Sequence, residues 1–171
     1  MKNLEIRVAK PSDLLGVMYL LRQSIKDMNM RGIVHWNMHY PTYEIISEDV
    51  EKESLFIIKE SGYIVGMFVL NNELVDAYDS VNWNAENERS LVVHRMVVHP
   101  KWKDKNIEPE MLDFIEKYTS ENNYDAIRLD LFGSNMEEMD FFKSNAFEEK
   151  GEFLMEYQKV PFKCFEKSIK K

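Results

Sequence analysis

The hydrophobic pattern along the chain switches repeatedly between strand and helix periods. Residues 4–9, LEIRVA, carry an apolar side chain at every second position, which is typical of a strand. A helical period follows Pro11 and Ser12, which provide a suitable start. Its apolar positions are Leu14, Val17, Met18, Leu21, Ile25 and Met28. After the irregular aromatic stretch RGIVHWNMHYP, residues 43–53 predict a second, shorter helix.

The rest of the chain continues this alternation. SLFIIKE and YIVGMFVLNN predict two strands joined by a tight turn, and LVVHRMVVHP is an apolar run typical of a strand covered on both faces. A helix is expected from Ile107, then a buried strand in YDAIRLDLF and a short helix in NMEEMDFFKSNA. FLMEYQKV and FKCFEKS predict two closing strands. The order β-α-α-β-β-β-α-β-α-β-β predicts an α/β (α+β) fold in which helices flank a mixed sheet.

Size and charge narrow the classes of protein that fit this pattern. With 171 residues and 44% hydrophobic content, the chain can build one core, so residues 1–171 are interpreted as a single domain. A net charge of −8 argues against nucleic-acid binding, which requires a basic surface. The acids between Glu73 and Glu88 could attract a cationic amine, but a solvated, self-repelling loop is the favoured interpretation.

Cysteine content and apolar runs bear on the protein's location. Cys164 is the only cysteine, which excludes an intrachain disulfide and suits a reducing compartment. Its neighbours Phe162 and Phe165 indicate a buried, unreactive thiol. No apolar run approaches the roughly 18 residues that cross a bilayer, and MKNLEIRVAK lacks a signal-peptide core. We therefore expect a soluble cytoplasmic protein that does not associate with membranes.

Several segments, in their order and spacing, resemble a bacterial branch of the GNAT N-acetyltransferase family. They are GIVHWNMHYP, IVGMFVLNN, HRMVVHPKWK, YDAIRLDLFGSN and PFKCFEK. The resemblance implies the GNAT fold, a mixed and mostly antiparallel sheet of about seven strands with about four flanking helices, in which the fourth and fifth strands are splayed. It also implies that acetyl-CoA is the co-substrate. The backbone of Met96, Val97 and Val98 would then bind its pantetheine arm and polarise the thioester carbonyl.

The loop after this strand aligns with the family's pyrophosphate loop, whose pattern is Arg/Gln-x-x-Gly-x-Gly/Ala. That loop presents backbone N–H groups at a helix N-terminus to the phosphates. Here Asn106 stands at the first glycine position and Glu108 at the second. The cofactor-binding residues implied by the alignment are Lys103, Asp104, Lys105, Asn106, Ile107 and Glu108.

These replacements change the expected affinity for acetyl-CoA. Asn106 tolerates a left-handed backbone well, whereas Glu108 adds bulk and a negative charge close to phosphate. Two like charges about 6 Å apart repel by roughly 1 kcal/mol in water and by about 3 kcal/mol at an effective dielectric constant near 20. Lys101, Lys103 and Lys105 act in the opposite direction. We expect binding weaker by roughly 2–4 kcal/mol than at a glycine loop.

A later motif of the family also differs. Phe142 replaces the tyrosine that often protonates the departing thiolate, so turnover is expected to slow by about 10²-fold unless Tyr157 or water substitutes. The resemblance places Asn135 and Phe142 at the cofactor. Asn135 also fits the cap of a helix, and Asp130 is interpreted as structural.

Histidines and aromatic residues supply the remaining candidates. His94 in the central strand is a candidate catalytic base that draws a proton from the attacking ammonium through water, although a packing role is the simpler interpretation. His35 and His39 are spaced like zinc ligands on a helix, but the sequence shows no third ligand, so no metal is expected. The resemblance implies that Trp36, His39 and Tyr40 line the acceptor pocket.

The sequence thus predicts an acetyl-CoA-dependent N-acetyltransferase. It would act on a primary amine of a small molecule or peptide by direct attack in a ternary complex, with catalysis resting chiefly on positioning. The competing hypothesis is a catalytically impaired GNAT-fold protein with a ligand-binding or regulatory role, because two motif positions are altered. Homodimer formation is left open.

Overall fold

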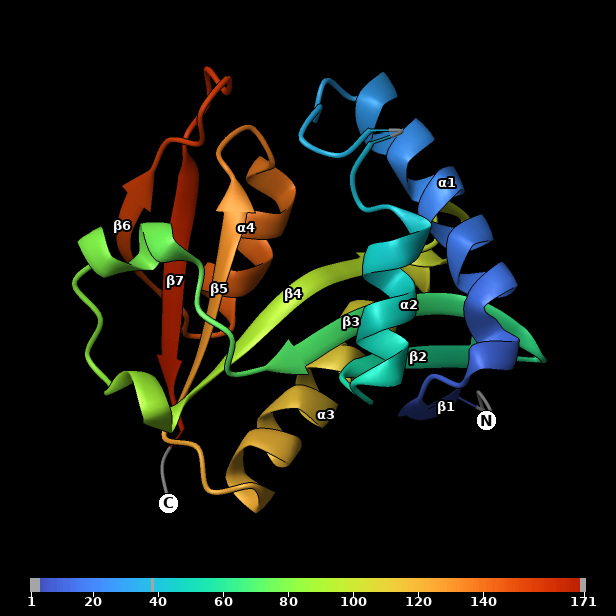
Figure 1. Cartoon of the computed structure of the whole chain (residues 1–171), viewed down its shortest axis with the longest axis horizontal. Helices are drawn as coiled ribbons and strands as arrows, with labels where there is room; N and C mark the ends of the chain where they lie inside the picture. The colour runs from blue at the N-terminus through green and yellow to red at the C-terminus, as the bar shows by residue number, and fades with distance from the viewer. Residues whose placement is uncertain (1–3, 38, 170–171) are drawn as a thin grey trace. The chain divides into compact units, whose positions relative to one another are not determined.

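A seven-stranded mixed sheet flanked by helices is formed by residues 4–37 and 39–169, the part of the chain that the computed structural model describes (Figure 1). The strand order is β1-β2-β3-β4-β5-β7-β6. The strands are β1 (Leu4–Val8), β2 (Leu55–Glu60), β3 (Tyr63–Asn71), β4 (Ser90–Val98), β5 (Ala126–Phe132), β6 (Glu148–Phe153) and β7 (Phe162–Ser168). The α-helices are α1 (Leu14–Met30), α2 (Tyr43–Glu51), α3 (Ile107–Glu121) and α4 (Met136–Ser144). The predicted class and order of elements are confirmed.

The chain divides into two compact units and passes from one to the other at the end of β3, inside β4 and inside α3. The first unit contains Met1–Leu70 and His94–Ile115, and the second contains Asn71–Val93 and Glu116–Lys171. The last part of β4 and the loop that follows it therefore belong to the first unit. Asn135 and Phe142 belong to the second unit.

In the first unit, helix α1 packs on an antiparallel meander. β1 pairs with β2, and β2 pairs with β3 through a turn at Ser61 and Gly62, both of which have positive φ angles, as a tight hairpin requires. Gly16 allows α1 to approach β3, because a Cβ atom at this glycine would lie 2.8 Å from Ile64 Cδ1. The buried residues of α1 are Leu14, Val17, Leu20, Leu21, Ser24 and Met28. These positions confirm the predicted helical period.

Gly66 in β3 marks a second close approach in the first unit. A Cβ atom there would lie 3.3 Å from the Val97 carbonyl oxygen of β4 and 3.3 Å from the Met111 sulfur of α3. Phe114 of α3 also packs against Phe56 and Phe68, with ring centroids 5.4 and 5.8 Å apart. The start of α3 is therefore fixed against the sheet, and this fixes the loop that leads into it.

In the second unit, β5 lies between a short parallel ladder and a long antiparallel one. Ser90–Val92 of β4 pair in parallel with Ala126–Arg128 of β5, and the ladder ends there. On its other edge, β5 pairs with β7 along its full length, from Ala126↔Ser168 to Phe132↔Phe162. The pairing of β4 with β5 thus covers only the first part of each strand.

The acidic segment between β3 and β4 is tied down by a buried arginine. Arg128 of β5 is fully buried and donates to Glu166 (2.9 Å), to Asn87 (2.8 Å) and to the Ala85 carbonyl. Its guanidinium carbon also lies 4.5 Å from the centre of the Trp83 ring. Trp83 is therefore a packing anchor for this segment, although the acidic side chains of the segment remain exposed.

A buried polar group of the second unit supports the structural interpretation of Asp130. The Tyr78 hydroxyl group donates to the Asp130 carboxylate at 2.6 Å. Burial raises the pKa of Asp130, and burial together with the Asp130 charge raises the pKa of Tyr78 well above its ordinary value. Burial also raises the pKa of Cys164 to about 12, as expected for an unreactive core thiol.

One predicted strand is wrong. The sequence predicts a strand over residues 153–160, but β6 is Glu148–Phe153 and the following residues form a connection. Phe153 already faces Phe162 in the antiparallel ladder of β6 and β7, so the intervening residues are needed to reverse the chain. Leu154 and Met155, which suggested a strand, are exposed.

None of the helices within residues 4–37 and 39–169 is long and apolar enough to cross a membrane.

Replacement of Arg128 by methionine is expected to lower the free energy of unfolding by about 3–5 kcal/mol, because it leaves the buried Glu166 carboxylate without its partner. Urea unfolding measures this change. Arg89→Met is the control, since the Arg89–Asp125 pair is partly exposed and should matter much less. Equal losses in the two variants would contradict the role assigned to Arg128.

Candidate functional site

The last residues of β4 present main-chain groups away from β3. The His99 N–H group donates to the Val65 carbonyl at 2.8 Å, so residues of the same parity as His99, including Val97, direct their main-chain groups toward β3. Met96 and Val98 therefore face the opposite way. The Val98 carbonyl oxygen accepts a hydrogen bond from the buried Ser24 hydroxyl group of α1 at 3.4 Å. Of the three backbone positions predicted to bind a ligand, Met96 and Val98 have the suitable direction.

Arg95 interrupts the regular conformation of β4. Its φ angle is 48°, in the left-handed region that costs a non-glycine residue about 1–3 kcal/mol. Its side chain donates to both carboxylate oxygens of Asp49, at 2.9 and 2.7 Å, and to the Tyr40 hydroxyl oxygen at 3.1 Å. Burial alone lowers the pKa of Arg95, but its interactions with Tyr40 and with the Asp49 carboxylate raise the pKa overall, so the guanidinium stays charged.

This ion pair was missed by sequence reasoning. The Asp49 and Arg95 side chains are only 8% and 13% exposed. A signal was present, because Asp49 lies on the same face of the expected helix as Ile46 and Val50, and Arg95 is the only arginine in an apolar strand. An acid on the buried face of a helix requires a nearby cation.

The loop after β4 keeps the backbone conformation that the glycine pattern requires. Residues Pro100–Lys105 form a 3-10 turn, and the His99 side chain accepts a hydrogen bond from the Lys101 N–H group. Asn106 then adopts the left-handed conformation, with φ 62° and ψ 31°, and α3 begins at the fully buried Ile107. Asn106 thus takes the conformation that glycine would supply.

Two lysine side chains of this loop have partners within the protein. Lys103 Nζ lies 3.6 Å from the Asp27 carboxylate of α1, and Lys105 Nζ lies 4.9 Å from the centre of the Trp102 ring. Glu108 stands in the first turn of α3. A phosphate group at this loop would compete with Asp27 for Lys103, and contact with Lys103 and Lys105 stays a prediction.

The three residues expected at an acceptor pocket differ in exposure. Trp36 is 8% exposed and its ring lies 5.4 Å from that of His35, whose pKa burial lowers to about 4. His39 is exposed, and Tyr40 is 39% exposed. Of these residues, Tyr40 is the one linked to β4, through Arg95. No cluster of three or more His, Cys, Asp or Glu side chains that could hold a metal occurs in the described part of the chain.

Asn135 and Phe142, the candidates in the second unit, make contacts within the protein, and their contact with a cofactor stays a prediction. Asn135 caps α4 by accepting a hydrogen bond from the Glu138 N–H group, which confirms the helix-cap interpretation. Phe142 is 2% exposed and packs edge-on against Phe141 and Phe147.

His94, the candidate base, belongs to the first unit. It is half-buried in β4, at the first residue of that strand that the first unit contains.

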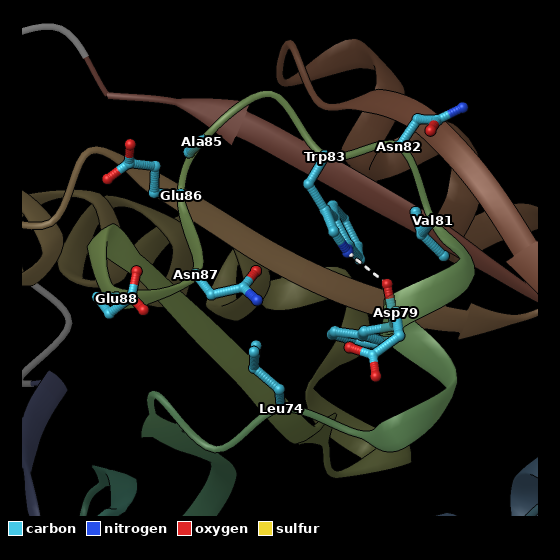
Figure 2. Close-up of a pocket in the computed structure, with 10 residues that line it drawn as sticks. Leu74, Asp79, Val81, Asn82, Trp83, Ala85, Glu86, Asn87 and Glu88 are labelled. Atoms are coloured by element: carbon cyan, nitrogen blue, oxygen red, sulfur yellow. Dashed lines mark hydrogen bonds between the residues drawn. The ribbon is translucent and has the colours of Figure 1, made fainter.

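The second unit also contains a hollow of about 470 Å³ in the segment between β3 and β4 (Figure 2). Trp83 lies at its centre and donates from Nε1 to the Tyr78 carbonyl oxygen at 3.0 Å. The lining residues are Leu74, Tyr78, Asp79, Val81, Asn82, Trp83, Ala85, Glu86, Asn87 and Glu88. Three of the acids considered above as a possible attraction for a cationic amine, Asp79, Glu86 and Glu88, line the hollow, but none of the predicted cofactor or acceptor residues does.

Asn106→Ala is expected to lower the free energy of unfolding by about 1 kcal/mol, because alanine resists the left-handed conformation, whereas Asn106→Gly should leave it almost unchanged. Urea unfolding of both variants provides the measurement. Lys101→Ala, at an exposed position of the same loop, is the matched control. An alanine variant as stable as the wild type would show that the position does not require this conformation in solution.

Comparison with solved structures identifies similar folds. A GNAT-family acetyltransferase from Streptococcus agalactiae aligns with a TM-score of 0.82 at 17% identity, covering 98% of this chain and 96% of that chain. A GNAT-family acetyltransferase from Listeria monocytogenes gives 0.75 at 19% identity, with coverages of 96% and 94%. The PaiA N-acetyltransferase from Thermoplasma acidophilum, solved in complex with coenzyme A, gives 0.73 at 16% identity, with coverages of 97% and 99%.

These likenesses confirm the GNAT fold. No curated protein matches the sequence. The family profile described as the acetyltransferase (GNAT) domain matches residues 6–159. Because that match spans most of the sequence, this chain belongs to the GNAT acetyltransferase family.

Proposed function

We propose that the protein transfers an acetyl group from acetyl-CoA to a primary amine, by direct attack of the amine on the thioester. The observation that carries this proposal is the pair of main-chain positions, Met96 and Val98, that face away from β3 and lead directly into the loop ending at Asn106. Membership of the acetyltransferase family supports acyl transfer. The coenzyme A complex of the Thermoplasma relative supports acetyl-CoA as the donor.

The backbone conformation of the loop favours an anionic ligand more clearly than the charges of its side chains do. The left-handed Asn106 is followed at once by α3, and the N-terminus of a helix favours a negative charge, although Pro109 in the first turn has no N–H group. Lys101, Lys103 and Lys105 add positive charge, and Glu108 adds a negative charge in the first helical turn. We expect binding that is real but weaker than at a glycine loop.

In the proposed reaction, the protein acts by positioning and by stabilising charge. The Met96 N–H group would donate to the thioester carbonyl oxygen, where negative charge develops as the amine nitrogen bonds to the carbonyl carbon. The C–S bond then breaks and its electron pair passes to sulfur. Water, or His94 through water, would accept the proton that the amine loses.

Acetyl-CoA is expected to stabilise the protein, and to be consumed with a suitable amine. A ligand at 100 times its Kd adds about 2.7 kcal/mol to the free energy of unfolding. Thermal shift with acetyl-CoA, followed by coenzyme A release across a panel of small amines and peptides, tests both parts. No shift at millimolar acetyl-CoA would contradict the proposal. A shift without transfer to any amine would favour the catalytically impaired relative.

Replacement of Glu108 by glycine is expected to tighten coenzyme A binding tenfold or more, because it removes both a like charge and a side chain near the phosphates. Glu108→Gln is the matched control, since it removes the charge and keeps the bulk. Isothermal titration gives both affinities. Unchanged affinity in the glycine variant would mean that Glu108 does not stand at the second glycine position.

A further inference from the structure

Tyr40 carries a hydroxyl group with unusual surroundings for an exposed phenol. Its oxygen lies 3.1 Å from Arg95 Nη1. Arginine can only donate hydrogen bonds, so the Tyr40 oxygen is the acceptor and its own hydrogen is available to another group. Because Tyr40 is 39% exposed, a bound molecule can reach that hydrogen.

The arginine that holds this phenol is itself immobilised. Two of its nitrogens, Nε and Nη2, donate to the two carboxylate oxygens of Asp49, which fixes the plane of the guanidinium. The third nitrogen, Nη1, reaches Tyr40. A negative charge that develops on the phenol oxygen would therefore meet a cation already in place, with no reorganisation needed.

This group is attached to β4 one residue before the backbone position proposed for the thioester. Arg95 directly precedes Met96, and the Cα atoms of neighbouring residues lie about 3.8 Å apart. The left-handed φ of Arg95 marks a local departure from regular strand conformation just before Met96. The Asp49–Arg95–Tyr40 group and the Met96 main chain belong to the same unit of the structure.

The position at which a proton donor is expected from the family motif cannot supply one. Phe142 has no hydroxyl group, and its side chain is buried among Phe141 and Phe147. Tyr157, the other phenol considered from the sequence, is 95% exposed in the connection between β6 and β7. Tyr40 differs from Tyr157 in having a fixed cation at its oxygen.

We propose that Tyr40 donates a proton to the coenzyme A thiolate as it leaves, and that Asp49 and Arg95 position the phenol for this step. The inference rests on the acetyl transfer proposed above. The C–S bond breaks with its electron pair passing to sulfur, and the Tyr40 O–H bond breaks as its proton moves to that sulfur. The phenolate, held next to Arg95, regains a proton from the water that took one from the amine.

Tyr40→Phe is expected to lower kcat by about 10²-fold, the usual contribution of a general acid, and to leave KM for acetyl-CoA and for the amine within about twofold. Tyr43→Phe is the matched control and should keep full activity, because Tyr43 is 52% exposed, at the start of helix α2. Steady-state kinetics and melting temperatures are measured for both. An unchanged kcat in Tyr40→Phe overturns the inference, as does a raised amine KM with unchanged kcat, which would make Tyr40 an acceptor-binding residue.

The positioning role of Arg95 has a separate test. Arg95→Lys keeps the charge but cannot contact Asp49 and Tyr40 with the same geometry, so kcat should fall while both KM values hold. Because Arg95→Met alone would leave Asp49 unpaired, the double variant Arg95→Met with Asp49→Leu removes both charges and keeps the fold testable. Adding Tyr40→Phe to either variant should cause little further loss of kcat, since the residues act as one unit. Fully additive losses would overturn the coupling.

The wild-type protein separates failure of this inference from failure of the proposed function. If no amine is acetylated by the wild type, the proposed function and the proton-donor role fall together. If the wild type turns over and Tyr40→Phe is equally active, only the proton-donor role falls.

Discussion

An arginine that is removed from water needs a carboxylate partner, and a strand in each unit of this structure carries such a pair. In the first unit, Arg95 pairs with Asp49 of α2. In the second unit, Arg128 pairs with Glu166 of β7. Breaking either pair leaves a buried charge, which costs far more than the loss of a surface pair. Both pairs therefore specify where a long segment is attached, α2 and its preceding loop in one case and the acidic segment in the other.

The two pairs differ in what they leave at the surface. Arg128 donates hydrogen bonds to Glu166, to Asn87 and to the Ala85 carbonyl, and all three contacts are structural. Arg95 uses one nitrogen on the hydroxyl group of a partly exposed tyrosine. A buried ion pair thus gives a purely structural anchor in one unit and holds a partly exposed hydroxyl group near β4 in the other.

Features that depend on local backbone preferences could be predicted from the sequence, whereas features that depend on contacts between distant residues could not. The hydrophobic pattern predicted the order of elements, and the motif register placed Asn106 where the structure has a left-handed residue, because both depend on local backbone preferences. The strand predicted over residues 153–160 was wrong because the pairing of Phe153 with Phe162 decides where the chain turns. The Arg95–Asp49 contact joins residues far apart in the sequence, so only the polar character of each in an apolar setting hinted at it. The role of Trp83 likewise depended on Arg128, which no local pattern connects to it.

The depth at which Cys164 is buried has a practical consequence. Its thiol is shielded within the sheet and its pKa is about 12, so at neutral pH almost none of it is in the reactive thiolate form. A cysteine introduced at a solvent-facing position would therefore react selectively with maleimide dyes or spin labels. The native sequence is thus ready for single-site labelling without first removing its own sulfhydryl group.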